Sequence, residues 1–304
     1  MSQVAIVGGG PWGIALARAA ARTGASVIHY TRRETKESRL VELTSSLETA
    51  ARAKLIVLAV PSQVAREVAR GLGDHVDGSH MIVHGVRGLD PEGLQTISDI
   101  VREETPVRRL GALGGPVQAA ELHHGTASAI VVGSPYPEVI RAVTSGFSGP
   151  WLRVFSTNDL RGLEWASALV GCVSLGVGFA ESAGAGPGLL AALIARAMHD
   201  AGRIAALAGA EEQTIYGLGG YGDLLASIAL EKRPEVVVGR VLAQGRSVAE
   251  AIAEAELRVE AIELIPRLCD FARSHGLKAP AFDGLARMLE GQPGEDILGR
   301  FFQV

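Results

Sequence analysis

The sequence is poor in the residues that define several common classes of protein. Only two of its 304 residues are cysteines, Cys172 and Cys269, which excludes a disulfide scaffold and predicts buried free thiols in a reducing cytoplasm. Charged residues make up 20% of the chain, the formal net charge is −4, and no long run carries one sign. The chain therefore lacks the basic face that nucleic acid or an anionic membrane would require. Any anionic ligand must bind at a local cluster of basic side chains.

Targeting and metal-binding signals are also missing. No charged segment followed by an apolar segment precedes the first apolar run, so we expect no secretion signal. The long apolar stretch over residues 166–185 contains seven Gly and Ser residues together with Glu181. That composition predicts a buried helix or helix-turn-helix core rather than a membrane span, and hence a soluble protein. His84, His123 and His124 have no metal-ligand spacing with the cysteines, so we expect no metal site and regard them as structural or solvated.

The N-terminal segment carries a glycine motif typical of dinucleotide binding. Residues 4–7 form an apolar run suited to a buried strand, and residues 8–13 then read G-x-G-x-x-G before an alanine-rich helix. In this setting Gly8 permits a tight turn, Gly10 lets a pyrophosphate approach the backbone, and Gly13 lets the helix lie close to the strand. The alternative is an α/β turn that is merely glycine-rich. We assign the cofactor turn to Gly8, Gly10, Pro11, Trp12 and Gly13.

Short apolar runs alternate with helical segments through the first half of the chain. These runs are residues 26–30, 54–60, 81–85, 110–113, 128–132 and 151–155. Such alternation predicts an α/β, Rossmann-type doubly wound parallel sheet covered by helices on both faces. Ligands of such sheets bind beyond the carboxyl ends of the strands. Arg87 and Gly115, which follow two of these runs, are therefore expected to face a ligand.

The second half of the chain predicts an all-helical C-terminal domain. Long alanine- and leucine-rich stretches have helical spacing, most clearly over residues 191–208. A second helix over residues 248–254 is opened by Ser247 with Glu250 three residues on, which is a capping box. We predict a dinucleotide-binding domain over residues 1–157 and a helical substrate and dimerisation domain over residues 158–304. We expect the substrate to bind in the cleft between them and the helical domain to form a homodimer.

Two basic residues bear on the choice between NAD and NADP. The run over residues 26–30 is followed by Arg32 and Arg33, with Glu34 one step later. An acidic residue at the end of this strand would bind the ribose 2′-hydroxyl of NAD, whereas arginines would hold the 2′-phosphate of NADP. We therefore predict that NADP is tolerated or preferred. The alternative is that both arginines belong to a solvated loop.

Taken in order and spacing, these motifs resemble those of the NAD(P)-dependent glycerol-3-phosphate dehydrogenase family over nearly the whole chain. The segments that carry the resemblance are residues 8–13 with Trp12, 60–63, 115–121, 162–164, 191–196 and 219–224. The resemblance implies hydride transfer between a nicotinamide cofactor and dihydroxyacetone phosphate or glycerol 3-phosphate. It implies cofactor contacts at Arg32, Arg87, Ala119, Arg233 and Glu260, and substrate contacts at Arg87, Gly115, Asp223, Lys232 and Arg233. Among these, it gives catalytic roles to Arg87, Asp223 and Arg233.

The chain departs from the family at the residue that donates the proton. The family has a Lys-Asn pair where this chain has Val170-Gly171, and valine can neither donate a proton nor stabilise an alkoxide. No lysine lies between Lys54 and Lys232, so no shift of alignment restores the donor. A second family lysine is Arg87 here, which keeps the charge but is a poor proton donor.

Two further family motifs are altered. The asparagine of the family's G-x-N segment is replaced in the run over residues 186–188, which reads Gly-Pro-Gly. The Ser-Arg-Asn segment that holds phosphate reads Lys232-Arg233-Pro234, so only its arginine remains. Lys232 is the one lysine close enough in sequence to substitute for the missing donor.

Several residues and the function itself have alternative interpretations. Asp223 could cap a helix or orient a proton donor, Arg233 could contact an anion or lie in a charged surface patch, and Tyr221 could donate a proton or pack over its glycine loop. Three functions remain open. The first is a dehydrogenase of the glycerol-3-phosphate type. The second is a catalytically inactive NAD(P)-binding regulatory protein. The third is a dehydrogenase of another small anionic substrate, with water or Tyr221 as the acid.

Overall fold

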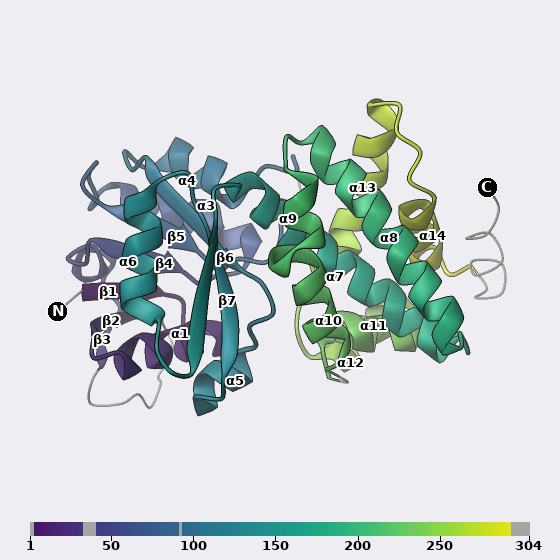
Figure 1. Cartoon of the computed structure of the whole chain (residues 1–304), viewed down its shortest axis with the longest axis horizontal. Helices are drawn as coiled ribbons and strands as arrows, with labels where there is room; N and C mark the ends of the chain where they lie inside the picture. Colours follow the sequence, from purple (N-terminus) through teal and green to yellow (C-terminus); the bar gives the residue numbers. More distant parts are fainter. Residues whose placement is uncertain (1–2, 33–40, 91–92, 231, 293–304) are drawn as a thin grey trace. The chain divides into compact units, whose positions relative to one another are not determined.

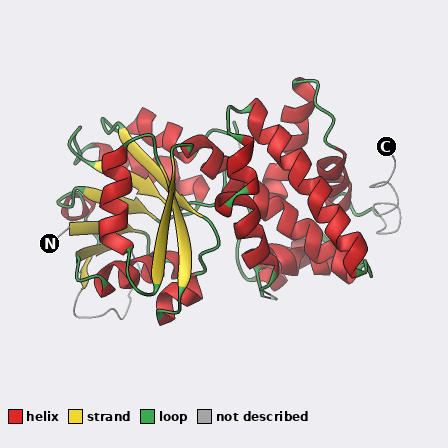
Figure 2. Ribbon diagram, in the orientation of Figure 1, coloured by secondary structure: helices red, strands yellow, loops and turns green. Residues whose placement is uncertain are grey.

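The computed structural model describes residues 3–32, 41–90, 93–230 and 232–292. Figure 1 shows a sheet with flanking helices formed by the N-terminal half and a bundle of helices formed by the C-terminal half. Figure 2 makes the division visible by secondary structure, because all strands belong to the first half and the second half is helical. The predicted fold class is confirmed.

An eight-stranded sheet forms the centre of the N-terminal half. Its strands are β1 (Gln3–Val7), β2 (Ser26–Tyr30), β3 (Val41–Thr44), β4 (Leu55–Leu58), β5 (Met81–His84), β6 (Arg109–Gly114), β7 (Ser128–Gly133) and β8 (Leu152–Thr157). Their order across the sheet is β3-β2-β1-β4-β5-β6-β7-β8. All neighbours are parallel except β6 and β7, which are antiparallel. The reversal of strand order at β1 and β4 is the point where doubly wound sheets bind their ligands.

One strand was not expected from the sequence. β3 pairs with β2 in parallel register, with Val41 opposite Val27. Only Val41 of its four residues is buried, because β3 is the edge strand and faces solvent on most of its surface. A strand this short and polar lacks the apolar run by which the other seven are recognised.

Both faces of the sheet are covered. The flanking helices are α1 (Pro11–Arg22), α2 (Leu47–Ala50), α3 (Ser62–Gly73), α4 (Ile97–Glu104), α5 (Ala119–His124) and α6 (Pro137–Phe147). Alternate residues of β1 belong to different clusters, with Val4 and Ile6 packing with α1 and α6 residues and Ala5 and Val7 packing with α3 and α4 residues. Strands buried on both faces explain the unbroken apolar runs in the sequence.

The C-terminal half consists of helices packed around a long apolar one. These are α7 (Leu160–Ser182), α8 (Pro187–Leu207), α9 (Glu212–Tyr216), the π-helical turn η1 (Leu218–Gly222), α10 (Asp223–Ile228), α11 (Pro234–Ala243), α12 (Val248–Ala255), α13 (Ala261–Ser274) and α14 (Pro280–Leu289). The predicted capping box is present: the backbone N–H of Ser247 donates to Glu250 Oε2 at 2.9 Å, and Glu250 N–H donates to Ser247 Oγ at 3.3 Å.

Helix α7 is the one described helix long and apolar enough, by length and composition, to cross a membrane. In the structure 89% of its apolar 18-residue stretch is buried within the protein. The prediction of a buried core helix in this stretch is therefore confirmed. Cys172 in α7 and Cys269 in α13 are buried free thiols. The prediction of buried free thiols is confirmed, and burial raises the pKa of both, that of Cys269 to about 12.

The chain divides into two compact units. Unit 1 comprises Met1–Asp90 and Gln95–Glu164, and unit 2 comprises Pro91–Leu94 and Trp165–Val304. The predicted boundary after residue 157 falls before α7, whereas unit 1 includes the first turn of that helix. Leu160 and Leu163 account for this difference, because both are buried in the same cluster as residues of β1 and β4.

Candidate functional site

The glycine turn between β1 and α1 has two glycines that the fold itself requires. Gly8 has a φ of +142°, and a Cβ on it would overlap the carbonyl oxygen of Ala59. A Cβ on Gly13 would overlap the carbonyl oxygen of Gly8, so α1 lies directly against the turn. The buried His29 ring bonds through Nε2 to the Gly8 carbonyl oxygen at 2.8 Å. These positions accept only glycine because of the backbone around them.

Gly10 is different, because nothing in the protein requires it to be glycine. It is the N-cap of α1 with φ −81°, an ordinary conformation, and no atom lies within 4 Å of where its Cβ would be. No side chain caps the helix there, so its first N–H groups are available to a ligand. An open space at an uncapped helix N-terminus is suited to an anionic group such as a pyrophosphate.

Trp12 joins this turn to a second loop of unit 1. A Cβ on Gly85 would lie 2.5 Å from Trp12 Nε1, so the indole packs directly on the backbone that follows β5. Trp12 Nε1 is buried and has no hydrogen-bond partner among the described residues. Trp151 and Trp165 also have buried Nε1 atoms without a partner among the described residues, so this feature does not by itself mark a ligand site.

The ends of four strands bring most of the predicted unit 1 residues to one edge of the sheet. Arg32 is exposed two residues after β2, and Tyr30 at the end of that strand accepts a bond from the Gly8 N–H at 3.0 Å. Arg87 is half-buried in the loop after β5, and Gly115, with φ +88°, follows β6. Ala119 begins α5 just beyond. Arg33 and Glu34, the other residues in the cofactor argument, lie outside the described residues.

A buried hydrogen-bond network, which sequence reasoning missed, supports the loop that carries Arg87. Glu164 is 2% exposed and accepts from His84 Nε2, the Ser98 N–H and Ser98 Oγ, each at 2.8 Å. The Val86 N–H donates to His84 Nδ1 at 3.4 Å, so the ring proton that bonds Glu164 is on Nε2. His84 is thus structural, one of the two alternatives considered. The network fixes the backbone next to Arg87.

In unit 2, Asp223 lies at a special backbone position. It follows the π-helical turn η1, begins α10 and is fully buried. Its Oδ1 accepts a bond from Ser227 Oγ at 3.2 Å. The N-cap of α10 is Gly222 and no side chain caps this helix, so the interpretation of Asp223 as a cap is wrong. Tyr221 is half-buried in η1.

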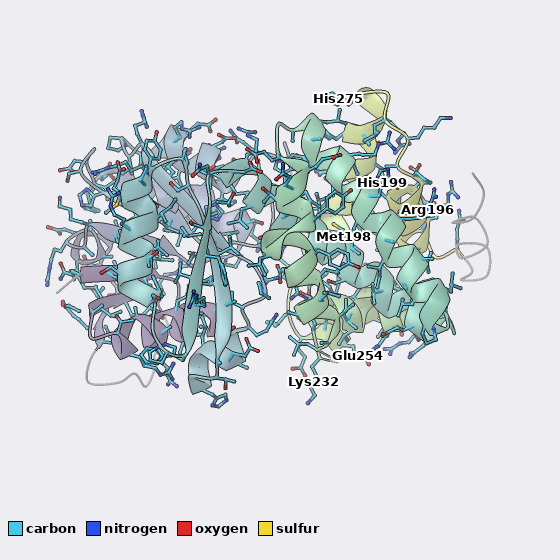
Figure 3. All side chains as sticks on the ribbon, viewed as in Figure 1. Arg196, Met198, His199, Lys232, Glu254 and His275 are labelled. Carbon is cyan, nitrogen blue, oxygen red and sulfur yellow. The ribbon has the colours of Figure 1, made fainter. Side chains whose placement is uncertain are left out.

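Arg233 is not part of a surface patch, contrary to one of its two interpretations. It is 7% exposed at the N-cap of α11, and its Nε donates to Glu235 Oε2 at 2.9 Å. Glu235 was not singled out from the sequence, although it stands only two residues beyond Arg233. Lys232 is exposed, and Figure 3 shows its side chain projecting away from the helices of unit 2. The adjacent residues thus lie in opposite environments.

The remaining predicted positions are also located in unit 2. Val170 is 1% exposed on α7, and Gly171 is buried next to it, with the Glu235 carboxylate 3.6 Å from where a Gly171 Cβ would be. Glu260 is partly buried directly before α13. Within the described ranges, no group of three His, Cys, Asp or Glu side chains is placed to hold a metal ion.

Comparison with known proteins points to one family in both halves of the chain. The family described as NAD-dependent glycerol-3-phosphate dehydrogenase N-terminus matches residues 35–140, and its C-terminal counterpart matches residues 159–297. A glycerol-3-phosphate dehydrogenase [NAD(P)+] of Fusobacterium nucleatum is 28% identical, covering 95% of this chain and 92% of the relative. One from Moorella thermoacetica is 29% identical, covering 99% and 96%. The crystal structure of glycerol-3-phosphate dehydrogenase from Coxiella burnetii superposes with a TM-score of 0.91 at 22% identity, covering 100% of this chain and 99% of that one.

Proposed function

Because this chain belongs to the NAD-dependent glycerol-3-phosphate dehydrogenase family, we propose that it transfers hydride between NADP or NAD and a small phosphorylated substrate of the glycerol 3-phosphate type. The observation that carries the proposal is the β1–α1 turn, in which Gly10 leaves open space at an uncapped helix N-terminus. The open space beside Gly10 has no role in the packing of the protein itself, and a bound pyrophosphate would occupy it.

The pyrophosphate and adenosine contacts of the cofactor are assigned to unit 1. The N–H groups at the start of α1 would hold the pyrophosphate, and Trp12 would support this turn by packing on the loop after β5. Arg32 is exposed at the end of β2 and would meet a 2′-phosphate on the adenosine ribose. The nicotinamide ring, once bound, supplies or accepts the hydride. Further contacts are assigned to Arg87, Ala119, Arg233 and Glu260.

Arg87 and Arg233 are both assigned to the anionic group of the substrate. Gly115 and Lys232 are further substrate positions. The carbonyl oxygen gains a proton when the substrate is reduced, and the buried Val170 has none to give. Asp223 is therefore assigned to orient a water, or the Tyr221 hydroxyl, as the acid. Asp223 and Arg233 are both buried polar groups, and this burial is more typical of residues in a binding site than of residues on a solvent-exposed surface.

The valine at position 170 also favours a second candidate function. With valine in place of the lysine, the chain could bind NAD(P) without catalysis and act as a regulatory protein, or act on another small anionic substrate. The test is to titrate NADPH and NADH against the intrinsic fluorescence of the protein and to follow absorbance with dihydroxyacetone phosphate present. Binding with turnover supports the dehydrogenase. Binding without turnover favours the second candidate, and absence of binding would contradict both.

We predict that Val170→Lys raises the rate of dihydroxyacetone phosphate reduction by roughly 10²–10⁴-fold, the contribution of a positioned proton donor. Val170→Met is the matched control, because it lengthens the side chain without a charge or proton. The measurement is kcat with saturating NADPH for the three proteins. An equal rate in all three would show that the site differs from that of the family in more than its acid.

We also predict that Arg32→Ala weakens NADPH binding about tenfold or more and leaves NADH binding nearly unchanged. A charge-assisted bond to a phosphate contributes ~1.5–3 kcal/mol, and only NADPH has the 2′-phosphate. Arg153→Ala, an exposed arginine on β8, is the control. Equal losses for both cofactors, or tighter NADH binding by the unaltered protein, would remove Arg32 from the site.

We further propose a cytoplasmic homodimer. Two buried free thiols and no disulfide support a reducing compartment. Sedimentation equilibrium measures the oligomeric state directly, and a concentration-independent monomer would contradict the dimer.

A further inference from the structure

Arg233 already has a carboxylate partner within its own chain. Its Nε donates to Glu235 Oε2 at 2.9 Å, with side-chain exposures of 7% for Arg233 and 18% for Glu235. A comparable bridge, Arg240 to Glu181, joins α11 to α7 but is 35% and 36% exposed. The shielding of the Arg233 pair from water makes its charge–charge interaction stronger than that of such surface bridges.

Gly171 provides the space in which this carboxylate lies. A Cβ on Gly171 would stand 3.6 Å from Glu235 Oε1 and 4.0 Å from its Cγ, so a longer side chain there would compete with the carboxylate for the same volume. The backbones of α7 and α11 are in contact nearby, because Cβ atoms on Gly178 and Gly239 would overlap the carbonyl oxygens of Val236 and Leu175. The start of α11 is thereby held against α7.

The charges around this pair leave little excess of positive charge for a ligand. The pKa of Cys172 is raised by burial first, then by Cys269 and then by Glu235. The effect of Glu235 means that the negative charge of this carboxylate lies close to α7, the helix of Cys172. A second acidic residue, the fully buried Asp223, stands ten residues before Arg233 in the chain. No lysine lies between Lys54 and Lys232, and Lys232 itself is exposed. The positive charge of Arg233 is therefore balanced by Glu235 before any substrate arrives.

We propose that Glu235 sets the affinity of the anion site at Arg233 by occupying it, so that a phosphate group binds only by displacing its carboxylate. Glu235 has this role only if Arg233 is the anion-binding residue of the proposed function. Because the carboxylate is tethered two residues away, it competes at a high effective concentration and weakens binding of every free anion. A phosphate dianion displaces it more readily than a monoanionic carboxylate does, since guanidinium binds phosphate strongly.

The test measures binding of inorganic phosphate and of glycerol 3-phosphate by isothermal titration calorimetry. We expect Glu235→Gln to bind both about tenfold more tightly than the unaltered protein. Glu181→Gln, which breaks the exposed bridge between the same two helices, is the matched control and should leave both affinities unchanged. Gly171→Asn is a second variant, because its side chain takes the space of the carboxylate, and it should also raise phosphate affinity.

Three outcomes would overturn the inference. Unchanged or weaker phosphate binding in Glu235→Gln would show that the carboxylate does not compete for Arg233. An equal gain in Glu181→Gln would show a general charge effect. Absence of phosphate binding in all four proteins would show that Arg233 is not an anion site. NADPH binding and circular dichroism of the same samples report on the fold and the proposed function separately, because phosphate affinity is measured without turnover.

Discussion

Gly10→Ala is expected to abolish tight binding of NADPH and NADH while leaving the fold unchanged. An alanine Cβ at this position meets no atom within 4 Å, and φ −81° suits alanine. The methyl group would instead lie where a pyrophosphate approaches the start of α1. Loss of one charge-assisted bond costs ~1.5–3 kcal/mol, so we expect roughly a tenfold to hundredfold loss of affinity for each bond broken.

Gly186→Ala is the matched control for this experiment. Gly186 is the N-cap of α8, has φ −69°, and also has no atom within 4 Å of its Cβ position. Fluorescence titration gives the affinities, and thermal unfolding without cofactor shows whether the variants remain folded. Equal cofactor affinity in Gly10→Ala and the unaltered protein would mean that the turn is only a glycine-rich connection.

Glu164→Ala is expected to cost about 3–5 kcal/mol of the free energy of unfolding, because it leaves three buried donors unsatisfied and each such donor costs ~1–3 kcal/mol before the structure relaxes. The substitution leaves His84 Nε2 and both Ser98 donors without their acceptor, in a region where Glu164 is 2% exposed and His84 is also 2% exposed. At ~2–4 °C per kcal/mol for a unit of this size, the melting temperature should fall by about 6–20 °C.

The exposed Glu103 provides the control for Glu164. It bonds Arg66 at 2.8 Å with half of its side chain in solvent, so Glu103→Ala should cost less than about 1 kcal/mol. Urea unfolding of the two variants gives the comparison. Similar small losses in both would show that the Glu164 network does not hold the first turn of α7 to the start of α4 and the end of β5.

The Gly10→Ala and Glu164→Ala experiments separate ligand binding from the stability of the framework in unit 1. Gly10 is free of the protein's own packing, so its substitution reports on a ligand. Glu164 contacts no expected ligand, so its substitution reports on the framework that supports the Arg87 loop. We expect a chain with valine at position 170 that keeps both features to bind the cofactor, and the Val170→Lys comparison tests whether a proton donor is all that the site needs.

The sequence by itself determined the features that local patterns encode. The turn between β1 and α1 was predictable because Gly8 and Gly13 admit no Cβ and Gly10 marks an open helix start, so three glycines within six residues specify the geometry. Seven of the eight strands were predictable because each coincides with a mainly apolar run, and the run is continuous where the strand is buried on both faces. The capping box at Ser247 and the burial of α7 followed from composition and spacing in the same way.

The tertiary structure alone decided which polar groups meet. Glu164 bonds His84 across 80 residues of sequence, and no local pattern indicates that partner. The carboxylate of Glu235 lies against Gly171 because glycines let α7 and α11 approach, which also decides that Arg233 is buried and paired while its neighbour Lys232 is exposed. Hydrogen bonds and ion pairs between distant segments depend on how helices and strands pack. The sequence therefore singled out Arg233, but only packing revealed that Glu235 is its ion-pair partner.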